Sequence, residues 1–537
     1  MKMKNTVFLE KKGISIATKC FTSIFYFFLF SLSSLAACVD KEPVDEEDVD
    51  PAINPHSSFL EDEESGGGSG STGPVFPTFA NYAPAFPGAE GYGKNAEGAR
   101  NSGSREVYIV TNLNDNGTGS FRDAISQPNR IIVFNVDGVI ECSQDALALS
   151  NNLTILGNTA PGDGIVLVNS YVSASNRSNV IIRFLRVRMG NKYWSEGSKD
   201  CLALARCKNV IVDHCSITWG RDENCSVTKD SGESSENVTI QNCIIGQGLE
   251  NHSCGGLMES DIDKGITSFR NLLIDNKTRN FKVKGLNQFV NNVLYNWGEG
   301  AAYNMSGNSE GDSETTIEDN YFIVGPGNMW RNALVSTDPD GTKNYEFQYI
   351  QVTPAKPFKD GNSNFKTYLS GNYYDTNKNG VLDGHLLLQE EWSGDPTILS
   401  TPSILHPSIK SQTNATDAYK YIVEKVGAYL PTRDEVDTYL IEELTSLGTK
   451  GTIIGRPFSV TQFPIGGCGN FKTGTPKTDT DGDGMPDEFE DKWGLDKNKA
   501  QDAIQIAENG YTMIENYALS LEYPAEYEKA WKEAYSE

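Results

Sequence analysis

The chain is poor in several features that would place it in a class at once. It carries a formal net charge of -26, so it lacks the basic balance expected of a nucleic-acid partner. None of its 10 cysteines lies in a CxxC pair, the usual spacing of a zinc site. Its one long apolar run, residues 24–37, is too short and too early for a convincing membrane span. Composition therefore argues against nucleic-acid, zinc-site and membrane-spanning classes.

The negative charge is concentrated near the two ends of the chain. Residues 39–64 contain eleven acids and one Lys, and residues 473–537 contain sixteen acids and six Lys. Each of these segments contributes -10, residues 65–472 contribute another -10, and residues 1–38 contribute +4. The acidity thus belongs largely to an N-terminal tether and a C-terminal tail.

The first 38 residues have the pattern of an export signal. Lysines precede the apolar run IFYFFLFSLSSLAA, which ends at Cys38. The sequence LAAC resembles a bacterial lipobox, which predicts lipidation of Cys38; the alternative is an ordinary signal peptide with a chance Cys. The acidic stretch that follows resembles surface-export signals of bacterial lipoproteins. We therefore expect an outer-membrane lipoprotein, at the cell surface or in the periplasm, that touches the membrane only through its lipid anchor.

A register of small polar residues recurs along the middle of the chain, with short β-branched segments such as NVIVDHC and NVTIQNC ahead of it. Spacing near 28 residues indicates a solenoid in which each repeat forms one coil. Single short strands at this spacing predict an all-β fold, a right-handed parallel β-helix with a few peripheral helices. Stacked side-chain amides would form a ladder that satisfies buried turns. The predicted column is His214, Asn242, Asn271, Asn292, Asn320 and Asn372, at steps of 28, 29, 21, 28 and 52 residues.

Six cysteines lie between residues 201 and 254, and Cys215 and Cys243 share one repeat position. Stacked cysteines on adjacent coils suit either a buried thiol ladder or disulfides, since export permits oxidation. We favour buried small hydrophobic side chains.

Composition and pattern divide the chain into five segments. Two helices are expected in the fourth, the first ending at Gly427 and the second opened by a capping box at residues 432–435. The predicted segments are a signal peptide (1–38), an acidic and Gly/Ser-rich tether (39–75), the β-helix domain (76–345), a final coil with packing helices (346–472) and a C-terminal segment (473–537).

The C-terminal segment begins with a loop rich in acids. Hard oxygen ligands at loop positions 1, 3, 5, 9 and 12, with Gly484 at position 6 for the sharp turn, suit Ca²⁺. We expect a structural calcium site rather than a catalytic one. Its predicted ligands are Asp479, Asp481, Asp483, Asp487 and Glu490.

Six stretches between residues 80 and 300 carry a resemblance to a known family. They are PGAEGYG (87–93), TNLNDNGTGSFRDAI (111–125), IIVFNVDGVI (131–140), LTILGNTAPGDGI (153–165), NVIVDHCSITWGRDE (209–223) and VNNVLYNWG (290–298). In this order they resemble the pectate lyase family of polysaccharide lyases. The resemblance implies a pectin-lyase-like β-helix that acts as a monomer on pectate or a related anionic plant polysaccharide, with Ca²⁺ as cofactor. Cleavage would be a β-elimination, in which a cation stabilises the charge that spreads onto the uronate carboxylate.

The resemblance also implies roles for individual residues. The family's base is an Arg in an RxPxxR-like pattern, which matches Arg279 here; Phe281 stands where the family has Pro, and Lys284 where it has the second Arg. Lys282 and Lys284 would bind uronate carboxylates, and His252 would contact sugar. An arginine acts as a base only where its surroundings make deprotonation cheaper, because its ordinary pKa exceeds about 12.

The resemblance assigns the calcium of the substrate groove to acids. Asp200 and Asp222 match family ligands, and the third family acid falls near Ser226, which is a poor replacement. Glu223 is the candidate that compensates.

Three other functions remain open on the sequence. A β-helical polygalacturonate hydrolase needs clustered carboxylates at fixed separation, and the coil region has no adjacent Asp pair. A non-catalytic glycan-binding lipoprotein is motivated by Phe281 and Ser226. A structural adhesin would lack calcium-dependent glycan affinity.

Overall fold

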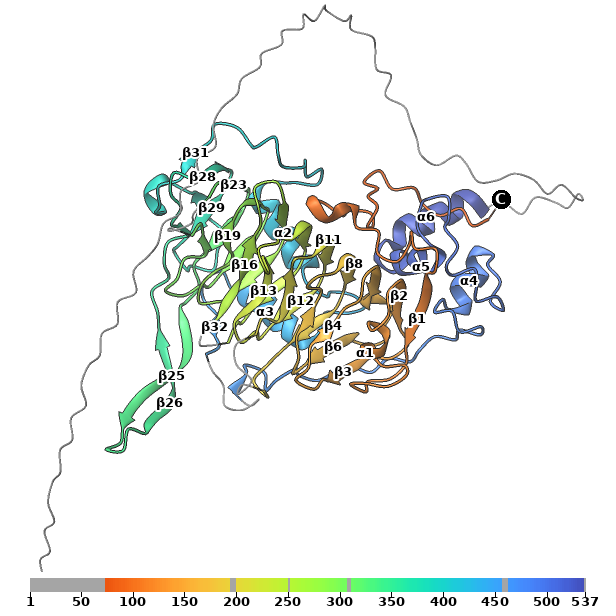
Figure 1. Cartoon of the computed structure of the whole chain (residues 1–537), viewed down its shortest axis with the longest axis horizontal. Helices are drawn as coiled ribbons and strands as arrows, with labels where there is room; N and C mark the ends of the chain where they lie inside the picture. The colour runs from red at the N-terminus through yellow and green to blue at the C-terminus, as the bar shows by residue number, and fades with distance from the viewer. Residues whose placement is uncertain (1–72, 194–198, 250–251, 307–310, 456–461, 536–537) are drawn as a thin grey trace, which may run out of the picture. The chain divides into compact units, whose positions relative to one another are not determined.

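Short strands, nearly all of them parallel, stack into three sheets (Figure 1). The computed structural model describes residues 73–193, 199–249, 252–306, 311–455 and 462–535. The predicted signal peptide, Cys38 and nearly all of the predicted tether lie outside these residues. Residues Gly70–Glu537 form one compact unit.

The chain visits the three sheets in the same order in successive coils, which makes the fold a right-handed parallel β-helix as predicted. Sheet 1 contains β1 (Glu106–Val110), β2 (Arg130–Phe134), β5 (Leu153–Leu156), β8 (Ser178–Arg183), β11 (Lys208–Asp213), β14 (Glu236–Gln241), β17 (Gly265–Phe269), β20 (Leu286–Val290), β23 (Ser313–Glu318), β28 (Phe365–Ser370) and β31 (Thr397–Ile398). Sheet 2 contains β3 (Gly138–Glu141), β6 (Ile165–Val168), β9 (Arg186–Arg188), β12 (Ser216–Thr218), β15 (Ile244–Gly246), β18 (Leu272–Ile274), β21 (Val293–Tyr295), β24 (Tyr321–Ile323), β29 (Tyr373–Asp375) and β30 (His385–Leu386). Sheet 3 contains β4 (Leu147–Ala148), β7 (Val172–Ser173), β10 (Leu202–Ala205), β13 (Glu223–Thr228), β16 (Cys254–Glu259), β19 (Lys282–Lys284), β22 (Tyr303–Asn304) and β27 (Phe358–Lys359).

The interior of the coil is filled by aliphatic side chains stacked in register. Pairing of β5, β8, β11, β14 and β17 places one such side chain of each strand in a single row. Every member is fully buried, and burying a side chain of this size contributes about 1.5–3 kcal/mol. The row is Leu153, Val180, Val210, Val238 and Ile266.

A ladder of buried amides runs along the turn after sheet 1. The backbone N–H of Asn271 donates to Oδ1 of Asn292 at 3.0 Å, Asn292 donates in the same way to Asn320 at 2.8 Å, and Asn320 to Asn372 at 3.2 Å. The ladder continues upstream through sulfur, since Cys243 N–H donates to Asn271 and Cys215 N–H to the Cys243 thiol. Each rung satisfies a backbone group that the turn leaves unpaired.

The predicted column was wrong at two of its six positions. Strand register aligns Asp213 with Gln241 and Gln241 with Phe269, so His214 and Asn242 lie one residue before the ladder. Both occupy the left-handed backbone position of the turn, with φ of 49° and 54°. Asn adopts this conformation more easily than most residues, which explains a polar residue there without an amide ladder.

The cysteines behave as small hydrophobic side chains, as predicted. All eight that lie in the described ranges have free thiols, and all but Cys468 are buried. Burial raises the pKa of the Cys201 and Cys207 thiols to about 12, so they remain neutral.

Two helices cover the outer face of sheet 2. Helix α2 (Ala415–Lys425) is capped by Asn414, and α3 (Glu435–Thr445) is capped by Asp434, which accepts from the N–H of Asp437. The predicted capping box at residues 432–435 was therefore wrong, because Asp434 supplies the capping oxygen. Both helices pack on side chains of sheet 2 such as Leu272 and Val293.

The C-terminal segment folds against sheet 1 rather than apart from the coils. Helices α4 (Asp487–Trp493), α5 (Met513–Glu522) and α6 (Pro524–Tyr535) share a core with the outward side chains of β2, β5, β8 and β11. A short helix, α1 (Phe121–Ala124), lies before β2. Within the described ranges, no helix is both long and apolar enough to cross a membrane.

A hairpin interrupts the coil after β24. It consists of β25 (Asn328–Thr337) and β26 (Lys343–Gln351), and β25 also pairs with the short strand β32 (Thr452–Ile453). In Figure 1 the hairpin extends away from the stacked strands.

Candidate functional site

The predicted site residues lie on one edge of the β-helix, in the turns that join sheet 2 to sheet 3. We call these successive turns the turn column. Asp200 precedes β10, Asp222 and Glu223 lie at the start of β13, His252 precedes β16 and Arg279 precedes β19. Because the three sheets stack coil on coil, four consecutive turns bring these five residues together.

Three carboxylates meet at the centre of this edge. Oxygens of Asp200, Asp222 and Glu223 all lie within 4.8 Å of one another. The backbone N–H of Glu223 donates to Oδ1 of Asp200 at 3.3 Å. Burial, and then the charges of Asp200 and Asp222, raise the pKa of Glu223 to about 8. An ordinary glutamate ionises at a much lower pH, so the environment of the Glu223 carboxylate favours binding of a proton or a cation.

An arginine and a histidine side chain flank the carboxylates. Arg279 Nη1 pairs with Oε1 of Glu223, and His252 Nδ1 contacts Oδ1 of Asp222. The Arg279 side chain remains 32% exposed, whereas Glu223 is buried. Burial alone would lower the pKa of Arg279, but the neighbouring Cys254 and Glu223 raise it overall. In this arrangement Arg279 is protonated and serves as the counter-charge of Glu223.

A chain of buried amides supports the turn that carries Arg279. Asn224 Nδ2 donates to Oδ1 of Asn276 at 2.9 Å, and Asn276 Nδ2 donates to Oδ1 of Asn280 at 2.8 Å. All three side chains are buried. The sequence did not predict these three residues, although Asn224 directly follows Glu223 and Asn280 directly follows Arg279. The chain connects the turn of the carboxylates to the turn of Arg279.

The two predicted substrate lysines lie on β19. Lys282 and Lys284 are half-buried and alternate with Val283, which points into the core, so both lie on the outer face of sheet 3. Lys282 pairs in register with Leu257, which pairs with Ser226. Ser226 is buried, and its hydroxyl has no hydrogen-bond partner in the described structure. The lysines therefore lie on the outer face of sheet 3, two strands along from β13, which begins at Glu223.

The acidic loop of the C-terminal segment forms a second group of carboxylates. Asp479, Asp481 and Asp483 lie within 4.8 Å of one another, and so do Asp483, Glu490 and Asp502. Burial, and then neighbouring carboxylates, raise the pKa of Asp483 to about 7 and that of Glu490 to about 8. Glu490 is fully buried, and both of its oxygens lack a hydrogen-bond partner. Unpaired buried carboxylates are costly unless a cation neutralises them.

One predicted ligand of this loop lies apart from the two groups of carboxylates. Asp487 lies outside both groups and instead accepts hydrogen bonds from the backbone N–H and hydroxyl of Thr480. Asp502, which the loop spacing did not include, takes a place beside Asp483 and Glu490. Only the folded chain reveals it, because Asp502 comes from a later segment.

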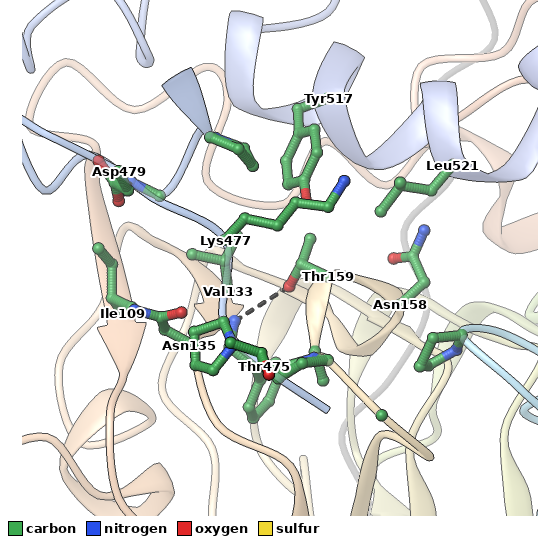
Figure 2. Close-up of a pocket in the computed structure, with 18 of the residues that line it drawn as sticks. Ile109, Val133, Asn135, Asn158, Thr159, Thr475, Lys477, Asp479, Tyr517 and Leu521 are labelled. Atoms are coloured by element: carbon green, nitrogen blue, oxygen red, sulfur yellow. Dashed lines mark hydrogen bonds between the residues drawn. The ribbon is translucent and has the colours of Figure 1, made fainter. Parts of the chain in front are cut away.

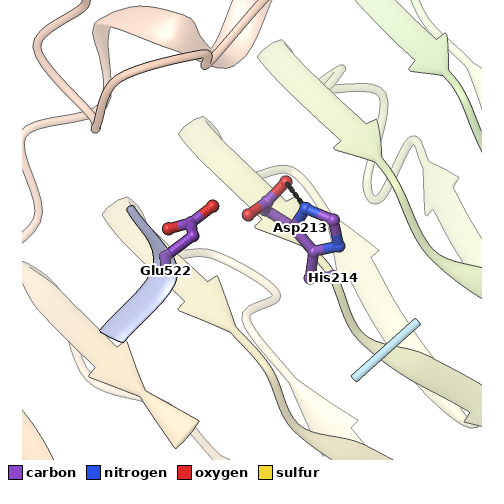
Figure 3. Close-up of side chains that lie close together, drawn as sticks. All are labelled: Asp213, His214 and Glu522. Carbon is purple, nitrogen blue, oxygen red and sulfur yellow. Dashed lines mark ion pairs between the residues drawn. The ribbon is translucent and has the colours of Figure 1, made fainter. Parts of the chain in front are cut away.

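A third group, Asp213, His214 and Glu522, lies between β11 and the end of α5 (Figure 3). Arg183 bonds both acids, with nitrogen–oxygen distances of 2.7 Å to Asp213 and 2.9 Å to Glu522. His214 stacks on Phe184 with ring centroids 5.1 Å apart, and burial lowers the pKa of its imidazole. Because a buried guanidinium already balances the two acids, this group ties the C-terminal segment to the coils, in agreement with an architectural role for His214.

A cavity outside the turn column is lined by residues of the first coils, the acidic loop and α5. It has a volume of about 370 Å³ and lies between the first coils on one side and the acidic loop and α5 on the other (Figure 2). Its lining is largely apolar, with Thr159, Lys477 and Tyr517 as polar contributors. It contains none of the five residues of the turn-column site.

Comparisons with known proteins place these features in context. A family model described as pectate lyase matches residues 83–347. The chain is 45% identical over 443 residues to a probable pectate lyase C of Aspergillus flavus, covering 82% of this chain and 95% of that protein. It is also 45% identical over 437 residues to a probable pectate lyase C of Aspergillus fumigatus, covering 81% and 93%. Among solved structures, the major cedar-pollen allergen Jun a 1 matches with a TM-score of 0.43 and 17% identity, covering 63% of this chain and 92% of the allergen.

Proposed function

Because the chain is a polysaccharide lyase of the pectate lyase family, we propose that it cleaves pectate by calcium-dependent β-elimination, with Arg279 as the base. The observation that carries the proposal is the meeting of Asp200, Asp222, Glu223 and Arg279 on one edge of the β-helix. Lys282 and Lys284 would bind neighbouring uronate carboxylates, and His252 would contact sugar.

The donor set fits calcium. Three carboxylates supply hard oxygen ligands, and partial exposure of Asp200 and Asp222 leaves room for a substrate carboxylate. When bound, the ion supplies positive charge beside the uronate carboxylate onto which the elimination places negative charge. Asp200, Asp222 and Glu223 would hold it, which supports the predicted compensation of Ser226 by Glu223.

Glu223 links calcium binding to the state of Arg279. In the structure its carboxylate holds the guanidinium and thereby keeps it protonated. As a calcium ligand, Glu223 would share its charge with the ion and would hold Arg279 less strongly. Arg279 would first release its own guanidinium proton to solvent and would then take the proton from the carbon next to the uronate carboxylate. The electron pair of that bond forms the new carbon–carbon double bond, and the 4-linked oxygen leaves.

A hydrolytic mechanism fits the site less well. Paired acids in glycoside hydrolases stand about 5–5.5 Å or 6.5–9.5 Å apart, on opposite sides of the bond that breaks. Here all three carboxylates converge within 4.8 Å, and Glu223 pairs with Arg279. The arrangement is that of a cation site. An assay for unsaturated product on pectate, with calcium and with chelator, tests the proposal; absence of that product in both would contradict it.

The calcium requirement should depend on pH. Since the pKa of Glu223 is raised to about 8, protons compete with calcium below this value. We expect the calcium concentration for half-maximal rate to rise about tenfold for each pH unit from 8 down to 6. Initial rates in calcium titrations at each pH measure this.

Glu223→Gln removes the competing proton and should abolish that pH dependence while raising the calcium requirement. Glu233→Gln is the matched control, because Glu233 pairs with Arg206 on a neighbouring coil, as Glu223 pairs with Arg279. A wild-type calcium requirement that stays constant between pH 6 and 8 would remove Glu223 from the ligand set.

The N-terminus supports a proposal about localisation. The lipobox-like LAAC before the acidic stretch suggests an outer-membrane lipoprotein anchored through Cys38. The relatives named above are fungal, so this proposal depends on the residues alone. Full-length protein expressed in a Gram-negative host should incorporate labelled palmitate, and Cys38→Ala should not. Equal labelling of the two forms would argue for an ordinary signal peptide.

A further inference from the structure

The hairpin of β25 and β26 is an insertion in the turn column, which also contains the candidate active site. It is inserted between β24 of sheet 2 and β27 of sheet 3, the connection that carries Arg279 two coils earlier. With about 4.8 Å between stacked strands, its base lies roughly 10 Å along the β-helix from the turn of Arg279.

One face of the hairpin is aromatic. The register pairs Trp330 with Tyr349 and Leu334 with Tyr345, and Phe347 lies between the two tyrosines on the same face. Trp330 stacks on Phe347 with centroids 5.0 Å apart and an interplanar angle of 6°, and it also contacts Tyr349 at 5.0 Å. We call these five side chains the aromatic face.

This face is open to solvent. Tyr345 is 50% exposed, Tyr349 51% and Leu334 50%. The alternate positions of the strands, by contrast, include the exposed charged residues Arg331 and Glu346. A hairpin that needed only to be soluble would not concentrate its rings on one exposed side. Contiguous exposed apolar surface of this kind is typical of a binding surface.

One turn of the turn column, between β21 and β22, lies between the turn of Arg279 and the hairpin. The intervening turn carries Gly298 and Gly300, and a Cβ on Gly300 would lie only 2.0 Å from the Thr278 hydroxyl next to Arg279. The far side of the same turn bonds the segment that leaves the hairpin, since Ala355 N–H donates to the Gly298 carbonyl at 2.9 Å. Small residues therefore make up most of this turn, and Glu299 is its exposed side chain.

From this placement we propose that the aromatic face binds sugar rings of the polysaccharide chain that extends beyond the catalytic site toward the C-terminal coils. Pyranose rings present flat C–H faces, which pack on the negative face of an aromatic ring, while tyrosine hydroxyls remain free to bond sugar hydroxyls. The inference rests on the proposed function, because the catalytic turns and the hairpin would share one polymer. It adds a subsite for long chains that short oligomers do not reach.

The double variant Tyr345→Ser/Tyr349→Ser tests the proposal. Both side chains are half exposed, so their loss removes no core packing. We expect KM for long pectate to rise about tenfold, while kcat/KM for trigalacturonate stays within twofold of wild type. Tyr82→Ser is the matched control, because Tyr82 is 48% exposed and contacts Tyr511 of the C-terminal segment, away from the turn column.

The outcomes separate the hairpin from the catalytic proposal. If wild type cleaves both substrates and the double variant keeps the wild-type KM for long pectate, the proposal that the aromatic face binds sugar is overturned. If wild type cleaves neither, the proposed function fails, and retention of the protein in a pectate-containing native gel then decides the hairpin. Loss of retention in the double variant supports sugar binding by the aromatic face, and retention equal to that of wild type overturns it. A change from dimer to monomer in light scattering, with KM unchanged, would assign the face to a second copy and also overturn it.

Discussion

Arg279→Ala is expected to lower the turnover of pectate at least about a thousandfold, the range that a positioned proton acceptor contributes. Arg279 is 32% exposed and is not one of the side chains that form the hydrophobic core, so the variant should fold normally. Its loss leaves the carbon acid without a base at the edge where the carboxylates converge. Initial rates of unsaturated-product formation, with thermal unfolding recorded alongside, measure both effects.

Arg206→Ala is the control for this variant. Arg206 is 33% exposed and pairs with Glu233, so it matches Arg279 in exposure and in having a glutamate partner, but it lies after sheet 3 rather than before it. Its loss should leave turnover within about twofold of wild type. Near-wild-type turnover of Arg279→Ala would remove Arg279 as the base. A large loss in both variants would point to a general effect on the coil.

Removal of calcium from the C-terminal loop should have the largest effect on stability. A ligand at a thousandfold excess over its dissociation constant stabilises the folded state by about 4 kcal/mol. We therefore expect chelator to lower the melting temperature by about 5 °C or more at pH 8. Glu490→Gln should abolish most of this difference, because Glu490 is buried among the other carboxylates with no hydrogen-bond partner.

The pH dependence of the chelated protein gives an independent check. The pKa of Glu490 is raised in the folded state to about 8, so its protonated form is favoured there. This contribution to stability is fully present below the ordinary pKa of a glutamate and is lost as the pH rises through 8. The melting temperature in chelator should therefore fall between pH 5 and 9, and calcium should remove the decline. Asp491→Asn, an exposed acid paired with Lys497, should retain the calcium-dependent shift. A wild type indifferent to calcium would exclude a stabilising site in this loop.

The repeat spacing was enough to predict the β-helix, but not the exact alignment of its coils. The step of 29 residues between Asn242 and Asn271 joined two different positions of the turn, and only strand pairing separates them. Side-chain period explains this limit, since a shift of one residue changes which way a strand's side chains face. The ladder itself passes through Cys243, a residue that a search for amides does not find.

The candidate sites were predictable where one motif contains the residues and less so where the fold brings them together. Asp200, Asp222 and Arg279 came from a resemblance, and the structure places them side by side. Asp502 was missed, because it joins the acidic loop from a later segment. The hairpin was also missed, since its strands have no counterpart in the repeat and contact mainly each other.

The amide ladder has a consequence for how this fold can change. Asn320 and Asn372 are adjacent rungs, yet 52 residues separate them, whereas 28 separate Asn292 from Asn320. The additional residues between Asn320 and Asn372 leave the coil and return to it, and the ladder hydrogen bonds before and after them are kept. An insertion between sheet 2 and sheet 3 thus leaves the amide ladder intact. Evolution, or a protein engineer, can therefore exchange the segment inserted in the turn column beside the active site while the β-helix stays the same.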